Sequence, residues 1–547
     1  MRAIGGALVL GGLLVMLAAI FAFSMIERPA SFGDLKGRGH EWLTGSTVKF
    51  TRNWFREGAR PLRFAMLENP RSIEFPDLRS REPYVSYPVG CLLPVYGVSL
   101  LMRREPSPAM VMGVNLAGHF LGALGIFAIV ALGLKELGVA LVARVVLGLL
   151  AFLFYVFLPG PMYWLQNVYF SDQAILPIVV AAWLLEILDQ RSSGPGWGIA
   201  QSLVVGWGVF TDWLMVPVAA ALLLSKMSTR WRGLSPPARI GRSLLFLLPA
   251  LAAVALFAIQ VGGLDGFGSL RGKLLNRTGL AAGTTFHFSQ LYERFWKVYL
   301  PTNFGGAIAP WLLAISLVVV AVLYLEGRRR GGPVDTGSSS LSRLSLLMIV
   351  PPAVHCLVFW QHSVDHSFTP LRFLPAFACV PLVFVPFLVL RRLGLDARDR
   401  RVSLAVMVIA TNALVFLAGG HRMSGVARER EPANPRLGTS VGQLARYDEV
   451  LFSPDFEIPA NPPELLAYSM KRVYPLVAPE SLSARIASLP SAAQVRLVFL
   501  REPELAWQPL LEQARREDAA PLITYRLGAV SDLRHESTRE ESAPRRP

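Results

Sequence analysis

The chain has 547 residues, of which 53% are hydrophobic and only 17% are charged. A soluble domain carries about 25% charged residues, so this composition indicates a membrane protein. The net charge of +16 would also suit a nucleic-acid-binding protein, but the arginines cluster in short loops between apolar segments, and this placement argues against nucleic acid as a partner.

The N-terminal segment contains one arginine followed by about 22 apolar residues, whereas the apolar part of a signal peptide has only about 7–15. We therefore expect residues 4–26 to form a retained transmembrane helix, with cleavage after Ala22-Phe23-Ser24 as the minor alternative. A span needs roughly 20 apolar residues to cross about 30 Å of hydrocarbon. By this measure the sequence predicts about eleven spans, near 4–26, 109–134, 139–159, 172–188, 197–211, 212–225, 243–262, 307–325, 342–361, 371–390 and 402–419.

The orientation follows from three arginine-rich loops, which should be cytoplasmic: 226–242, 326–332 and 391–401. Counting spans backwards from these loops places the N-terminus in the cytoplasm and a large first loop, 27–108, outside. The segment 89–102 is apolar, but it is short and contains Pro94. A span there would turn the arginine clusters outward, so we expect a re-entrant or interfacial helix on the outer side.

The C-terminal part differs in character from the apolar segments. Residues 421–532 contain short runs of β-branched and aromatic residues, such as QVRLVFL and LITYRL, between helical segments. They predict a small extracytoplasmic α/β domain behind a membrane domain at 1–420. The charged tail at 533–547 should be disordered.

Placing an ionisable side chain within a membrane span costs roughly 2.5–3.5 kcal/mol of insertion free energy, so residues of this kind tend to be functional. Here they gather at the predicted outer ends of the spans: Glu41, Asp172, Asp212, His362, Asp365, His366 and Arg372. Structural alternatives exist. Asp172 and Asp212 can cap helices, and Glu41 can be a solvated loop residue. The i, i+4 spacing of His362 and His366 suits a metal ion, but no third ligand is evident.

The order of these features resembles the GT-C class of membrane glycosyltransferases. The resemblance is to the protein O-mannosyltransferase and aminoarabinose transferase-like proteins of glycosyltransferase family 39, and it covers about residues 1–420. GHEW matches an acidic residue in the first outer loop, and YVSYPVG matches a tyrosine/proline step before an amphipathic helix. Asp172 matches an acidic residue entering span four, and HSFTPLRFLP matches a late outer loop. The chain departs from the pattern with Glu41 where aspartate is common and with Ser-Phe after His366.

The resemblance implies transfer of a sugar from a polyprenyl-phosphate donor to an acceptor hydroxyl, with inversion, on the extracytoplasmic side of a bacterial inner membrane. Glu41 would be the general base, and Asp172 would orient the acceptor or the sugar. The other expected substrate-binding residues include groups for the lipid phosphate: His40, Tyr87, His362, His366, Arg372, Arg271 and Lys273.

The acceptor can be a lipid, a glycan or a protein. The spacing leaves room for a divalent cation, Mg²⁺ or Mn²⁺, near Glu41 and Asp172 without requiring one. Two other classes of function stay open: a transporter or flippase for lipid-linked substrates, and a non-catalytic membrane scaffold. The charged residues lie at the outer face and no internal repeat is detectable, which argues against the transporter.

Overall fold

The structure is a computed structural model. It describes residues 2–28, 32–35, 40–192, 194–281, 286–329, 336–393, 441, 446–455, 470, 472–476, 478–500, 502–512, 514–519 and 522–534. The chain forms two compact units. The first unit consists of Met1–Phe32, Val85–Pro94 and Met112–Glu429, and the second of Gly33–Tyr84, Val95–Val111 and Arg430–Pro547.

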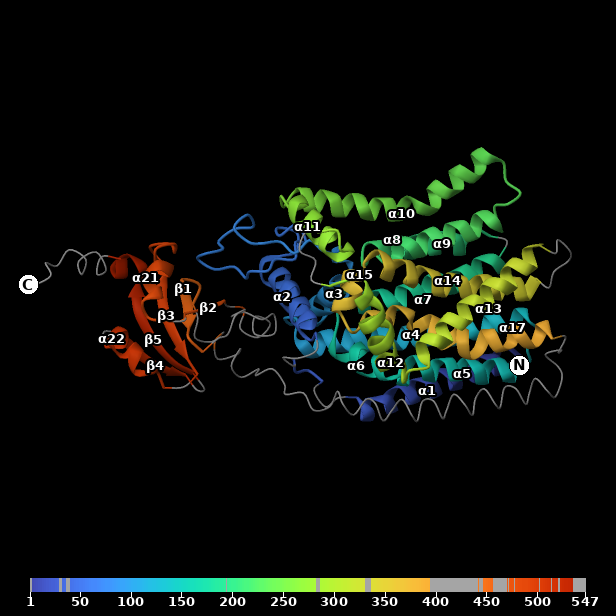
Figure 1. The fold of residues 1–547 in the computed structure, drawn as a ribbon, viewed down its shortest axis with the longest axis horizontal. Coiled ribbons are helices and arrows are strands. Elements are labelled where there is room, and N and C mark those ends of the chain that lie inside the picture. The colour runs from blue at the N-terminus through green and yellow to red at the C-terminus, as the bar shows by residue number, and fades with distance from the viewer. Residues whose placement is uncertain are drawn as a thin grey trace, which may run out of the picture. The chain divides into compact units, whose positions relative to one another are not determined.

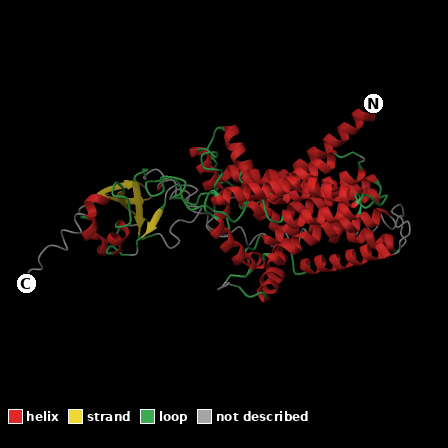
Figure 2. Ribbon diagram, turned by 90° about the horizontal axis from the view of Figure 1, so that it is seen from above, coloured by secondary structure: helices red, strands yellow, loops and turns green. Residues whose placement is uncertain are grey.

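The first unit is a bundle of apolar helices, most of which run roughly side by side (Figures 1 and 2). Among the described residues, seven helices are long and apolar enough to cross a membrane. An eighth is added if α5 (Leu141–Phe157) and α6 (Pro159–Asn167), which meet at 59°, count as one span. The seven contain or lie within α1 (Arg2–Glu27), α4 (Pro108–Glu136), α7 (Ser171–Arg191), α10 (Pro236–Gly262), α13 (Ala309–Arg329), α14 (Thr336–Val358) and the run Thr369–Arg392.

The last of these spans changes its helical type several times. It passes through a 3₁₀ turn η3 (Thr369–Phe373), α16 (Leu374–Cys379), a π turn η4 (Val380–Phe384) and α17 (Val385–Arg392). Pro375, Pro381 and Pro386 recur along it, and each lacks the N–H that would continue an α-helix. The local shifts of hydrogen-bond pattern therefore follow from the sequence.

The predicted spans 197–211 and 212–225 correspond to two short helices, α8 (Gly196–Val209) and α9 (Met215–Ser228), each of 14 residues. A helix of this length extends about 21 Å, which is less than the roughly 30 Å thickness of the hydrocarbon core. Their polar contacts show that they run in opposite directions. Gln201 of α8 and Lys226 of α9 both contact Glu186 near the end of α7, whereas Asp212 between them lies near the start of α7, beside Arg372. The predicted span 402–419 lies outside the described residues.

The remaining helices of the first unit are short or lie in connections. Alongside the 3₁₀ turn η1 (Val89–Cys91) and the π-helix η2 (Leu291–Tyr299), they are α11 (Phe267–Thr278), α12 (Leu300–Phe304) and α15 (Trp360–Asp365). The segment predicted to be re-entrant or interfacial forms η1 and α3 (Leu93–Met102), an apolar stretch of less than span length.

The second unit contains α2 (Trp42–Glu57) and a five-stranded sheet. The strands are β1 (Glu449–Ser453), β2 (Val473–Pro475), β3 (Gln494–Phe499), β4 (Arg515–Ala519) and β5 (Leu522–Ala529), in the order β2-β1-β3-β5-β4. β1 is parallel to β2 and β3, and β5 is antiparallel to β3 and β4. Short helices α21 (Ser481–Ile486) and α22 (Gln508–Leu511) accompany the sheet, as does the 3₁₀ turn η6 (Leu505–Trp507).

Figure 1 draws these five strands as arrows in red to orange, and Figure 2 draws them in yellow. The expected fold class, a polytopic helical membrane protein with a small C-terminal α/β part, is therefore confirmed. Of the tail predicted to be disordered, residues 535–547 lie outside the described part of the chain.

Candidate functional site

A buried arginine, Arg372, is the centre of a polar cluster in the first unit, with only 1% of its side chain exposed. Its Nη2 donates a hydrogen bond to Oδ1 of Asp172 and lies 3.9 Å from Oδ1 of Asp212. Its Nη1 donates to Nδ1 of His355. Removing an ion from water costs several kcal/mol, so a buried guanidinium persists only where carboxylates compensate its charge. Here two carboxylates, each at most 5% exposed, supply that compensation.

Asp172 and Asp212 both lie near the starts of helices, where an aspartate can cap the free backbone N–H groups. The N-cap of α7 is Phe170, whose backbone N–H donates to the side chain of Gln173, so Asp172 lies inside the first turn and is held by Arg372. Asp212 lies in the turn before α9, where its Oδ1 accepts the N–H of Leu214 at 2.7 Å; Leu214 itself is the N-cap residue of that helix. The same carboxylate also lies within reach of Arg372, so its structural and electrostatic roles coexist.

The histidines of the late loop lie beside this ion pair. His362 Nε2 is 3.7 Å from Oδ1 of Asp172 and 3.3 Å from the hydroxyl of Tyr87. The ring of His366 lies against that of His362, with 4.2 Å between centroids. Burial lowers the pKa of both imidazoles, that of His362 well below its usual value despite the nearby carboxylate of Asp172. At neutral pH the pair therefore offers neutral hydrogen-bonding groups.

Tyr87 is held in place by the segment YVSYPVG. The N–H of Gly90 donates to the carbonyl of Phe210 at 2.8 Å, and a Cβ at position 90 would lie 2.4 Å from that oxygen. Only glycine permits so close an approach. The indole of Trp213 donates to the carbonyl of Ser86. These contacts attach the segment to the turn between α8 and α9 that carries Asp212.

The two basic residues predicted to bind the donor phosphate, Arg271 and Lys273, lie on α11. Arg271 and Lys273 are exposed. Arg277, which was not among the predicted site residues, lies over the ring of Tyr87, and its guanidinium carbon is 4.2 Å from the ring centroid. Gly279 ends α11 in the left-handed conformation, with Trp360 so close that a Cβ would meet its indole at 2.4 Å. This contact docks the end of α11 on α15 and thereby brings Arg277 to the cluster.

Glu41 and His40 belong to the second unit of the chain. Glu41 is fully buried at the N-cap of α2, where a carboxylate interacts favourably with the helix dipole. His40 has φ 72°, a left-handed conformation that costs a non-glycine residue roughly 1–2 kcal/mol. Such strain often marks a functional position. The catalytic and binding roles of Glu41 and His40 stay predictions.

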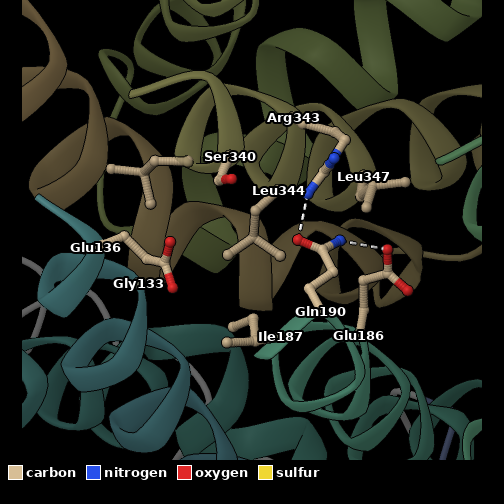
Figure 3. A pocket seen from close by; sticks show the side chains of 10 residues that line it. Gly133, Glu136, Glu186, Ile187, Gln190, Ser340, Arg343, Leu344 and Leu347 are labelled. Carbon is tan, nitrogen blue, oxygen red and sulfur yellow. Dashed lines mark hydrogen bonds between the residues drawn. The ribbon is translucent and has the colours of Figure 1, made fainter. Parts of the chain in front are cut away.

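A small cavity between α4, α7 and α14 is shown in Figure 3. Its volume is about 30 Å³, and its polar lining includes Glu186, Gln190 and Arg343, which are linked by hydrogen bonds. Ligand sites usually measure about 300–1,000 Å³, so this space suits a water molecule and not a sugar.

No group of three or more His, Cys, Asp or Glu side chains within the described part of the chain is arranged to hold a metal ion. His362 and His366 are close together, but the acidic neighbour Asp172 is bound to Arg372.

No protein-family model matches the sequence, and no curated protein sequence matches it. Solved structures share its fold. ArnT from Cupriavidus metallidurans bound to undecaprenyl phosphate is similar with a TM-score of 0.55 and 12% identity, covering 94% of this chain and 98% of that one. The apo state of the same protein gives a TM-score of 0.53 and 13% identity, covering 96% and 99%.

The apo oligosaccharyltransferase of Archaeoglobus fulgidus is similar with a TM-score of 0.54 and 11% identity, covering 89% of this chain and 69% of that one. These proteins are GT-C glycosyltransferases. The chain therefore has the GT-C fold, as the family resemblance implied, and is a multi-pass membrane protein.

Proposed function

We propose that this protein is a membrane glycosyltransferase that moves a sugar from a polyprenyl-phosphate donor to an acceptor hydroxyl. The observation that carries the proposal is the buried Asp172–Arg372–Asp212 cluster at one end of α7, in a fold shared over nearly its whole length with ArnT bound to undecaprenyl phosphate. Buried ionisable groups in a membrane domain are costly and therefore tend to be functional.

The proposed reaction is a single displacement. The acceptor oxygen attacks the anomeric carbon, the bond from that carbon to the phosphate oxygen breaks, and polyprenyl phosphate leaves with the electron pair. The configuration inverts, and a general base takes the hydroxyl proton. We assign Glu41 as that base and Asp172, fixed by Arg372, as the group that orients the acceptor or the sugar.

The leaving phosphate needs positive charge and hydrogen-bond donors. Arg372 is almost fully buried and already engaged by carboxylates. We therefore assign the phosphate contacts first to the more accessible Arg277 and His366, with Arg271 and Lys273 attracting the donor from the exposed face of α11.

The distribution of basic residues between the two ends of the bundle supports a site on the extracytoplasmic side of a bacterial inner membrane. Basic residues collect at the end of α7 opposite Asp172, where Arg191 pairs with Glu136 and Arg230 with Asp189. Arginine-rich ends face the cytoplasm in membrane proteins. The Asp172 cluster would then face the outer side, where lipid-linked donors are used.

The test is incorporation of radiolabel from a panel of polyprenyl-phosphate sugars by membranes containing the 547-residue chain. Transfer by the wild-type chain and its loss in Glu41→Gln, with unchanged expression and thermal unfolding, is the expected result. Separate arms follow label into lipid, glycan and protein fractions. Movement of the intact donor across the bilayer without sugar transfer would instead identify a transporter, and neither activity would point to a scaffold.

A further inference from the structure

A second cavity of about 640 Å³ lies at the other end of the bundle, where α8, α10 and the connection after α9 meet. Asp189, which lines it, lies 17 positions after Asp172 on α7, so the cavity is on the order of 25 Å from the candidate active site along this helix. Its volume falls in the range of small-molecule and lipid-headgroup sites. Nothing in the proposed glycosyl transfer uses it.

One wall of this cavity is apolar and open. Ile199 and Leu203 of α8 and Leu245 and Leu248 of α10 line it, and their exposed fractions are between 58% and 69%. In a membrane-spanning bundle such outward leucine and isoleucine side chains contact acyl chains. A ligand of this cavity therefore has one part among hydrocarbon.

The lining also contains charged side chains. Lys226 and Arg230 contact Asp189 at 2.6 Å and 2.5 Å, and Lys226 also reaches Glu186, so these four charges balance. Arg242 adds a cation at the rim. It is exposed and makes no ion pair within the described part of the chain.

The segment 226–242, which runs from the end of α9 into the first turns of α10, strengthens the positive charge. Residues 226–242 contain five basic residues and no acidic one. Trp231 lies buried beside Phe246, with 6.4 Å between ring centroids, and tryptophan is typical of the level where headgroups meet hydrocarbon. The cavity thus combines a tryptophan, an uncompensated arginine and an open hydrocarbon wall.

We propose that this cavity binds an anionic phospholipid of the surrounding leaflet. The phosphate contacts Arg242 and the exposed edge of Arg230, and an acyl chain lies along Leu203 and Leu245. Basic pockets between transmembrane helices bind anionic headgroups in this way. The excess positive charge selects an anionic headgroup over a zwitterionic one, and the open apolar wall selects a lipid over a soluble phosphate.

The test uses the purified, delipidated full-length protein in detergent. Its thermal unfolding is followed while phosphatidylglycerol, phosphatidylcholine or inorganic phosphate is titrated in, since a ligand of the native state raises the midpoint. We expect a saturable rise with phosphatidylglycerol alone. Arg242→Gln should lower the apparent affinity about tenfold, the loss expected for one charge-assisted contact.

Arg232→Gln is the matched control, because it removes the same charge from the segment 226–242 at an exposed position outside the cavity lining. It should bind like the wild type. Leu203→Trp fills the apolar wall without changing charge and should also weaken binding. If Arg242→Gln and Arg232→Gln lowered the apparent affinity for phosphatidylglycerol equally, binding would depend on general surface charge, and the proposal would be overturned. A rise with inorganic phosphate, or an equal rise with phosphatidylcholine, would overturn it too.

Discussion

Arg372 and Asp172 are 200 residues apart in the sequence, and their side chains form a hydrogen-bonded ion pair that is almost completely buried. The pair joins the start of α7 to the 3₁₀ turn before α16, and with Asp212 it also fixes the turn between α8 and α9. Three separate parts of the bundle thus depend on one guanidinium.

The first prediction concerns the stability of this cluster. Asp172→Ala should lower the free energy of unfolding by about 3–5 kcal/mol, because it leaves the charge of Arg372 under-compensated in a buried place. The double variant Asp172→Ala/Arg372→Met should recover part of that loss, since no unpaired cation remains. Thermal unfolding in detergent measures both. Glu293→Gln, which breaks the exposed pair with Lys297, is the control and should change stability little. A double variant that is no more stable than Asp172→Ala alone would contradict this coupling between the two side chains.

The second prediction concerns pH. Burial lowers the pKa of His362 and His366 in the folded protein, while the unfolded value is about 6.5. Below about pH 6.5 the unfolded chain therefore binds more protons, so stability should fall as the pH decreases from 6.5 and should be insensitive to these groups above it.

Unfolding midpoints between pH 5 and 8 measure this effect. His362→Gln and His366→Gln should each reduce the slope on the acid side, whereas His287→Gln, at an exposed position, should leave it unchanged. An identical slope in all three variants would remove the loop histidines as its cause.

The third prediction concerns the proposed base. Glu41→Gln should lower the turnover of sugar transfer about 10²–10⁴-fold, the usual contribution of a general base, while the protein keeps its unfolding midpoint. A control at the exposed Glu293 should retain wild-type turnover. Full activity of Glu41→Gln would leave Glu41 as a helix-capping residue only.

The fourth prediction compares two arginines of α11. Arg277→Met should raise the donor KM about tenfold, because this guanidinium lies over Tyr87 beside the His362 pair. Arg271→Met, at an exposed position on the same helix, should have a smaller effect that weakens further with added salt. Equal effects of the two variants would assign both residues to general attraction of the donor.

The sequence was informative where a local property decides the structure. Apolar runs located the long helices, and the prolines of 369–392 account for its broken hydrogen-bond pattern. Asp172 was identified because a carboxylate beside an apolar run is expensive. Arg277 was not singled out, because its contact with Tyr87 depends on how α11 docks against Trp360.

His355 was missed for a related reason. It lies inside an apolar helix, α14, and only the fold brings Arg372 against it. Its position in an apolar run was the available signal. For Asp212 a capping role was predicted, but its hydrogen bond goes to Leu214 in the turn before α9, and its proximity to Arg372 depends on a residue 160 positions later.

The ion pairs at both ends of α7 have a mechanical consequence. Arg372 holds Asp172 at one end, and Lys226 and Arg230 hold Asp189 at the other. A helix fixed in this way cannot slide along its own axis, and its length sets a fixed hydrophobic thickness for the bundle. Bilayers that are thicker or thinner must then deform around the protein or make it tilt, at a cost of fractions of a kcal/mol per Å. Membrane thickness thus becomes a physical variable to which this protein must be matched.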